Sequence, residues 1–146
     1  PSLQLHDPLM YFPLAIPYLA AAVEEAGFSV WVADCRREVV PLPKARFYGF
    51  SCCTPHIGIA KQIVKQYDVQ GQSIIGGPHP TVMPEDCDNS FAYVVMGEGE
   101  KVLPEILAGK HRPGRVVAQR ILDLDALPLP AWHRVRHCVS TRLFPG

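Results

Sequence analysis

Short apolar segments alternate with helical patterns along most of the chain, and this alternation limits the fold more than any other feature. Four segments are predicted to be strands, over residues 28–34, 47–53, 72–76 and 91–96. Helical patterns occupy residues 13–26, the stretch after Pro55, and residues 101–108. Strands that are almost continuously apolar are typical of a parallel sheet with helices on both faces. The sequence therefore predicts a doubly wound parallel α/β sheet in three α/β/α layers.

The composition is that of a globular protein without a strong net electrostatic field. The chain has 146 residues, of which 48% are hydrophobic and 19% charged, so that it can bury one sizeable core. Fourteen basic residues balance fourteen acidic ones. A neutral balance gives no general attraction to nucleic acid or to an anionic membrane, so we expect neither as a partner.

Two further features bear on the location of the protein. The longest uncharged stretch, residues 8–23, contains Pro13 and Pro17 and is shorter than the roughly 20 apolar residues of a membrane span. We interpret it as a buried helix. The five cysteines form no C-x-x-C pair and are odd in number, which indicates reduced thiols and a cytoplasmic protein.

The character of the chain changes after Gly109. Residues 115–119 are predicted to form a small strand, and the Leu- and Pro-rich residues 122–132 resemble a stiff connector. We expect residues 1–110 to form a ligand-binding domain and residues 111–146 a small hairpin and linker toward another domain. The absence of an initiator methionine also suggests a piece of a longer protein.

The candidate ligand site lies where the predicted strands end. In open parallel sheets, ligands bind beyond the carboxyl ends of the strands. Asp34 and residues 51–56, 76–81 and 97–100 all follow predicted strands, so we expect them to line one edge of the sheet. We call the three loops 51–56, 76–81 and 97–100 the rim. Ser51 and Thr54 supply hydroxyls, and paired glycines let another molecule approach the backbone. The rim contains no Lys or Arg, which favours a bulky, polar, weakly charged ligand.

Each rim feature also has a purely structural interpretation. Gly76 and Gly77 can form a simple turn at the end of a strand, and a histidine between prolines, as His79 is, more often packs than binds a ligand. Cys52 and Cys53 are most simply core thiols. Residues 97–100 can be a turn followed by an acidic first helical turn.

Other kinds of site are not indicated. His133, His137 and Cys138 have helical spacing but lack a third oriented ligand, so we predict no metal site. The phosphate-binding patterns G-x-x-x-x-G-K-[ST] and G-x-G-x-x-G are both absent.

Five segments, in order, resemble one family. They cover residues 13 to about 132 and read PLAIPYLAAAVEEAGFSVWVAD, YGFSCCTPHIGIAKQIVK, IIGGPHPTVMPED, YVVMGEGEKVLPEIL and LDLDALPLPAW. Together they resemble the N-terminal cobalamin-binding domain of cobalamin-dependent radical S-adenosylmethionine enzymes. The resemblance implies a Rossmann-like (flavodoxin-like) domain that holds cobalamin. The cofactor-binding residues it implies are Tyr11, Phe12, Ser51, Cys52, Thr54, Pro55, Gly76, Gly77, Pro78, His79, Gly97, Glu98 and Gly99.

The same resemblance implies that this chain binds the cofactor and that another domain carries out the reaction. In that family a radical barrel carries an iron-sulfur cluster on C-x-x-x-C-x-x-C and uses S-adenosylmethionine, and this sequence has no such motif. We therefore expect a cofactor-binding part of a methyltransferase or cyclase, without catalytic residues of its own. Its partners would be the radical barrel of the parent chain and a small-molecule or peptide substrate held there.

The chain also departs from the related methionine synthase type. That type places a cobalt-binding histidine in D-x-H-x-x-G, whereas the corresponding stretch around residues 10–13 has no histidine. We expect the lower face of the cobalt to meet Tyr11 or Phe12, with no protein histidine as ligand. A first strand is predicted only at residues 2–6.

Two alternatives remain open at this point. One is a domain that kept this fold, lost the cofactor and serves in docking or structure. The other is a flavin-binding or receiver domain, which the sequence supports less because a receiver needs clustered acidic residues and Asp34 stands nearly alone. The substrate and the type of reaction stay undetermined.

Overall fold

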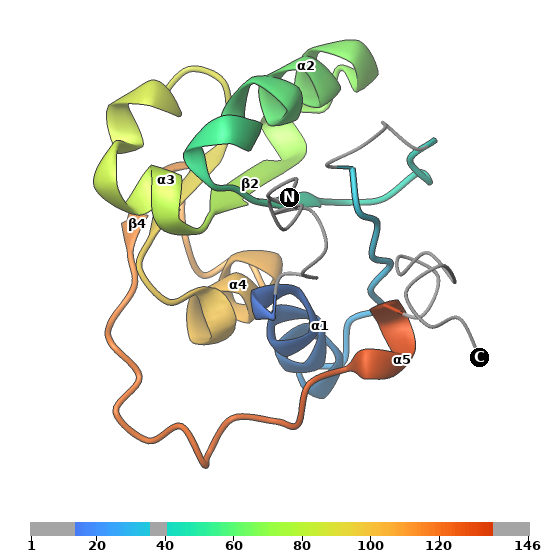
Figure 1. Cartoon of the computed structure of the whole chain (residues 1–146), viewed down its shortest axis with the longest axis vertical. Helices are drawn as coiled ribbons and strands as arrows, with labels where there is room; N and C mark the ends of the chain where they lie inside the picture. The colour runs from blue at the N-terminus through green and yellow to red at the C-terminus, as the bar shows by residue number, and fades with distance from the viewer. Residues whose placement is uncertain (1–13, 36–40, 136–146) are drawn as a thin grey trace, which may run out of the picture.

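A computed structural model describes residues 14–35 and 41–135 of the chain, shown in Figure 1. Its centre is a four-stranded sheet in the order β1-β2-β3-β4, with every neighbouring pair parallel. The strands are β1 (Tyr48–Ser51), β2 (Ser73–Gly76), β3 (Tyr93–Met96) and β4 (Gly114–Val117). The helices are α1 (Ala15–Glu25), α2 (Ile57–Tyr67), α3 (Pro78–Val82), α4 (Gly99–Leu107) and α5 (Trp132–Val135), with 3-10 turns η2 (Thr54–His56), η3 (Gln70–Gln72) and η4 (Pro84–Asp86).

Both faces of the sheet are covered by helices. Successive residues of a strand point to opposite faces, and β2 shows the consequence. Ile75 belongs to the cluster that contains Ala60 and Val64 of α2. Its neighbour Ile74 belongs to the cluster that contains Val102 and Ile106 of α4.

Figure 1 shows α2 on one side of the sheet and α1 with α4 on the other. The strands are therefore buried from both sides, as their nearly continuous apolar sequences predict. This arrangement confirms the predicted Rossmann-like, doubly wound parallel fold in three α/β/α layers.

One predicted strand is not formed among the described residues. Residues 28–34 are assigned to no strand, and Trp31 is 54% exposed. Val30 and Val32 pack instead against the cluster of Ala20 and Ala21 on α1. Alternate apolar side chains thus bury one side of this segment against a helix, a pattern that sequence alone does not separate from that of a strand.

The strand predicted over residues 115–119 is present as β4. It pairs in parallel with β3, with Gly114 opposite Tyr93 and Val117 opposite Met96. This pairing makes β4 the fourth strand of the sheet. The predicted division near residue 110 stays a prediction. The expected strand at residues 2–6 lies outside the described residues.

Beyond β4 the chain returns to α1. Residues 118–131 carry no helix or strand and leave Leu122 and Leu129 almost fully exposed. The Ala131 N–H donates to the Pro17 carbonyl at 2.9 Å, and Glu24 of α1 pairs with Arg134 of α5. Figure 1 shows this connector running around the α4 and α1 side to reach α5. In the described parts of the chain, no helix is long and apolar enough to cross a membrane.

Candidate functional site

The loops after β1 and β2 lie side by side at the carboxyl ends of the strands. The Cys52 N–H donates to the Gly76 carbonyl at 2.9 Å, and the His79 N–H donates to the Cys52 carbonyl at 3.1 Å. The second bond is possible because α3 begins directly after Gly77 and turns His79 back toward β1. Two of the three predicted rim loops are therefore joined through their backbones.

Gly77 is the tightest position in the rim. It has φ +105°, and a Cβ atom there would lie 2.9 Å from the Cys52 carbonyl oxygen and 3.0 Å from the Cys52 nitrogen. The group that approaches Gly77 is thus the main chain of the same protein. A Cβ at Gly76 would make only an ordinary contact, 3.7 Å from Cβ of Val95. Of the two adjacent glycines, therefore, only Gly77 is required by its backbone conformation and by the space around it.

His79 is packed beneath this loop. Its side chain is 2% exposed, and its Nδ1 lies 3.2 Å from the Thr54 hydroxyl. Its Nε2 lies 3.5 Å from the Asp86 carboxylate but makes no hydrogen bond of good geometry. The buried His79 agrees with the packed interpretation of a histidine between two prolines, and its role in binding a cofactor stays a prediction.

Thr81 connects the loop after β2 to the loop after β3. Its hydroxyl donates to the Gly77 carbonyl at 2.8 Å and accepts the Gly97 N–H at 3.0 Å. Thr81 lies in α3, a helix that the sequence prediction treated as a loop. Pro78 in its first turn and a threonine four residues after Gly77 were the available signals.

The third loop contacts the segment that follows β4 and the helix α1. Gly97 has φ +96°, and a Cβ there would lie 3.2 Å from the Ala118 carbonyl oxygen. The Glu98 carboxylate accepts the Ile121 N–H. A Cβ at Gly99 would lie 3.1 Å from Cδ2 of Leu19. Together with the Thr81 bonds, these contacts place all three predicted loops on one rim.

The two neighbouring cysteines have different surroundings. Cys52 is 4% exposed, and burial raises the pKa of its thiol to about 12. Cys53 is exposed and lies beyond the end of β1. The prediction of a core thiol is confirmed for Cys52 and wrong for Cys53.

The rim offers hydroxyls and backbone to an incoming molecule. Its exposed predicted residues are Thr54, Pro55, Pro78, Gly97 and Glu98, and its partly buried ones are Ser51, Gly76, Gly77 and Gly99. Glu100, in the first turn of α4, has a buried Oε2 atom without a hydrogen-bond partner among the described residues. Such an atom is a ready acceptor for a donor on a ligand. Tyr11 and Phe12 lie outside the described residues.

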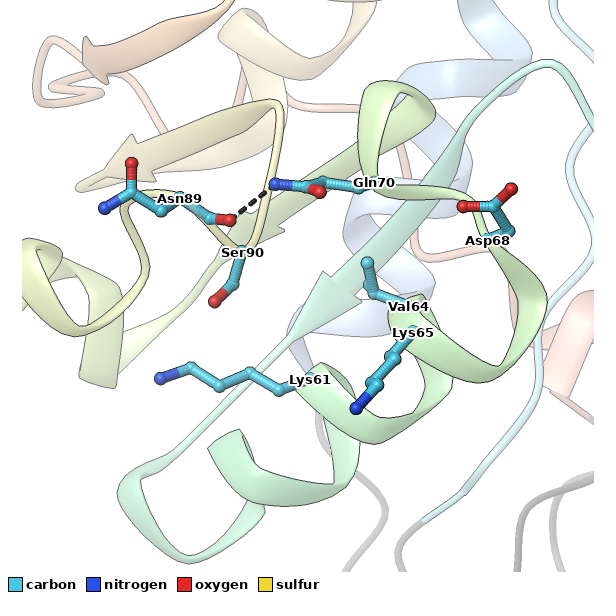
Figure 2. Close-up of a pocket in the computed structure, with 7 residues that line it drawn as sticks. All are labelled: Lys61, Val64, Lys65, Asp68, Gln70, Asn89 and Ser90. Atoms are coloured by element: carbon cyan, nitrogen blue, oxygen red, sulfur yellow. Dashed lines mark hydrogen bonds between the residues drawn. The ribbon is translucent and has the colours of Figure 1, made fainter.

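A separate pocket of about 340 Å³ lies between α2 and the segments that precede β2 and β3, and Figure 2 shows the residues that line it. Its lining comes from α2 and from the segments that precede β2 and β3, namely Lys61, Val64, Lys65, Asp68, Gln70, Asn89 and Ser90. The Gln70 amide donates to the Asn89 carbonyl across it at 2.5 Å. We call it the amino-end pocket, because it adjoins the amino ends of the strands and not the rim.

Metal ligands do not cluster in the part of the chain that the structure describes. Within residues 14–35 and 41–135, no group of three His, Cys, Asp or Glu side chains could hold a metal ion. His133 contacts Glu24, while His137 and Cys138 lie outside these ranges.

Comparison with known proteins gives one finding. The family model described as the B12 binding domain matches residues 8–107, which include all of the rim. Searches of curated proteins and of solved structures gave no significant match.

Proposed function

The chain belongs to the B12-binding domain family, and we propose that it holds cobalamin as the cofactor module of a cobalamin-dependent radical S-adenosylmethionine enzyme of methyltransferase or cyclase type. The observation that carries the cobalamin-binding part of the proposal is the family match over residues 8–107, which spans the three rim loops. The radical-enzyme part rests on the resemblance of the five sequence segments alone. Their place at the carboxyl ends of a parallel sheet is where ligands bind in such folds.

The chemistry of the rim suits cobalamin. The cofactor is large, carries many uncharged carboxamides and has only one phosphodiester. The rim has no Lys or Arg but offers the hydroxyls of Ser51 and Thr54, and Oε2 of Glu100 has no hydrogen-bond partner within residues 14–35 and 41–135. A carboxamide N–H would satisfy that oxygen, because carboxylates accept such bonds readily.

The residues of the chain would act by binding and orienting. We assign Ser51 and Thr54 to hydrogen bonds with the nucleotide tail, and the loop from Gly76 to His79 to the frame around it. Gly97 and Gly99 would border the corrin, whereas the Glu98 carboxylate already accepts the Ile121 N–H. When bound, cobalamin would supply the reactive cobalt, and the protein supplies position and electrostatics. The iron-sulfur cluster, S-adenosylmethionine and substrate would belong to a separate barrel domain.

Retention of hydroxocobalamin tests the binding claim. The purified chain is incubated with hydroxocobalamin, desalted and examined for visible absorbance. We expect retained colour, a weaker affinity after Ser51→Ala, and no change after Lys61→Ala, which alters only the amino-end pocket. Loss of all colour on desalting would count strongly against the proposal.

The lower face of the cobalt has its own test. We expect no protein histidine on the cobalt, with Tyr11 or Phe12 beside it. Cobinamide lacks the nucleotide base, so any nitrogen splitting in the electron paramagnetic resonance spectrum of reduced, bound cobinamide must come from the protein. We expect none, and a nitrogen splitting would refute the absence of a histidine ligand.

For the barrel domain, we expect C-x-x-x-C-x-x-C beyond Gly146 in the parent reading frame.

A specific observation also favours a second candidate, a docking domain that has lost the cofactor. Gly77 and Gly97 are explained by the backbones of Cys52 and Ala118, without any ligand. Under this alternative the chain would retain no cobalamin and yet bind a partner domain. The desalting experiment separates the two.

A further inference from the structure

The side chains of Thr54, His79 and Asp86 contact one another in that order, from η2 in the rim through α3 to η4. Thr54 lies in η2 at the exposed rim, and its hydroxyl oxygen is 3.2 Å from Nδ1 of His79. Nε2 of His79 is 3.5 Å from the Asp86 carboxylate in η4. The imidazole between them is 2% exposed, so that its two nitrogens meet protein groups and little water.

The Asp86 carboxylate determines which nitrogen of a neutral His79 carries the proton. An N–H at Nε2 would point its positive end toward the carboxylate, whereas a lone pair there would face a negative charge. Nε2 has no other hydrogen-bond partner among the described residues that could reverse this preference. The carboxylate therefore favours the tautomer of the neutral imidazole that carries its proton on Nε2.

This tautomer determines how Thr54 bonds. Nδ1 then has a lone pair and can only accept, so the Thr54 hydroxyl must donate its single hydrogen to it. The remaining lone pairs of the hydroxyl oxygen are all that Thr54 can offer to a molecule on the rim.

We propose that Asp86, acting through His79, fixes the Thr54 hydroxyl as a hydrogen-bond acceptor, so that the ligand group bound against it is an N–H or O–H donor. His79 and Asp86 are positioning residues in this arrangement. The identity of the ligand rests on the proposed function: for cobalamin, the donor is a corrin carboxamide or the ribose hydroxyl. The phosphodiester is excluded at this position because it carries no donor.

Nitrogen NMR of the cofactor-free chain tests which nitrogen of His79 carries the proton. Histidine is labelled with nitrogen-15, the spectrum is recorded near pH 8, and His79 is assigned by its loss in His79→Gln. We expect Nε2 to give a protonated, pyrrole-type signal and Nδ1 an unprotonated, pyridine-type signal. A proton on Nδ1, alone or together with one on Nε2, would overturn the proposal whether or not cobalamin binds.

Two neighbouring carboxylates provide a matched comparison. Glu85 and Asp86 both lie in the first turn of η4, and only Asp86 pairs with His79. Asp86→Ala should bring a protonated Nδ1 population into the spectrum, whereas Glu85→Ala should leave the tautomer unchanged. If both variants changed the tautomer of His79 equally at equal thermal stability, the loss of any nearby negative charge would explain the change, and the specific role of Asp86 would be refuted.

A double-mutant cycle tests the consequence for binding. One hydrogen bond to a ligand is worth about 3- to 10-fold in affinity, and Thr54→Val should weaken cobalamin binding by that amount while Thr54→Ser retains it. Asp86→Ala should weaken binding a few-fold in the native background and have no further effect with Thr54→Val. Equal losses in both backgrounds would refute the coupling.

Cobinamide then identifies the donor. It keeps the corrin carboxamides but lacks the ribose and the phosphodiester. If Thr54→Val weakens cobinamide and cobalamin equally, the donor is a carboxamide. If it weakens only cobalamin, the donor is the ribose hydroxyl. A Thr54→Val variant that binds cobalamin as tightly as the native chain would refute the contact.

Discussion

Replacing Gly77 by alanine is expected to disrupt the rim through the fold rather than through the ligand. Gly77 has φ +105° and ψ −171°, a region that is essentially restricted to glycine. A residue with a side chain held there costs about 1–3 kcal/mol. The new Cβ would also lie 2.9 Å from the Cys52 carbonyl oxygen.

That oxygen cannot easily move away, because it accepts the His79 N–H at 3.1 Å. Overpacking of this kind costs about 1–3 kcal/mol more. The sum, about 2–6 kcal/mol, is a large part of the 5–15 kcal/mol that stabilises an ordinary domain. Each kcal/mol lowers the melting temperature of a chain of this size by about 2–4 °C, so we expect a fall of at least about 4 °C.

Urea unfolding followed by circular dichroism measures the change in free energy. Gly76→Ala is the matched control, since its Cβ would meet only Cβ of Val95 at 3.7 Å. We expect this control to be neutral or stabilised by up to about 1 kcal/mol. If Gly77→Ala were as stable as Gly76→Ala, the close approach of Cys52 would be wrong. If Gly77→Ala also binds cobalamin less well, the weaker binding is expected to follow from the lower stability of the variant. It would not by itself show that a contact with the ligand was lost.

Three further predictions concern groups around the sheet. Thr81→Val removes the hydroxyl that bonds Gly77 and Gly97, and should destabilise the chain by about 1–3 kcal/mol while Thr81→Ser does not; equal unfolding free energies would contradict the link. Iodoacetamide at pH 8 should label exposed Cys53 well before Cys52, whose burial raises its pKa to about 12, and peptide mapping that finds Cys52 labelled first would refute this. The Arg115 guanidinium lowers the pKa of Asp88 below the ordinary 3.8, so any stability this pair contributes is present above that pH and is lost as the pH falls through the folded-state pKa. The unfolding free energy of Asp88→Asn should therefore converge with that of the native chain in acid, and a difference that grows in acid would contradict the sign.

The sequence was informative where local patterns decide the structure. The strands at β1, β2 and β3 are apolar on both faces, and parallel strands bring their carboxyl ends to one edge, so the rim follows from the order of elements alone. The sequence did not predict features that depend on contacts between residues far apart in the chain. Residues 28–34 have the apolar content of a strand, yet Val30 and Val32 pack on α1.

The same limit applies within the site. The glycines at 77 and 97 were predicted to admit a ligand, and only the structure shows the backbones of Cys52 and Ala118 against them. The series of contacts from Thr54 through His79 to Asp86 joins three separate elements, and no spacing rule connects them. Thr81 was missed because the bond it accepts comes from Gly97, sixteen residues away.

Hydrogen exchange with and without hydroxocobalamin tests the central claim, that the rim holds the cofactor, most directly. We expect slower amide exchange in residues 51–56, 76–81 and 97–100 when hydroxocobalamin is bound. Residues 61–70 and 89–90, around the amino-end pocket, should be unchanged. Protection around that pocket, or no protection in the rim, would contradict the account.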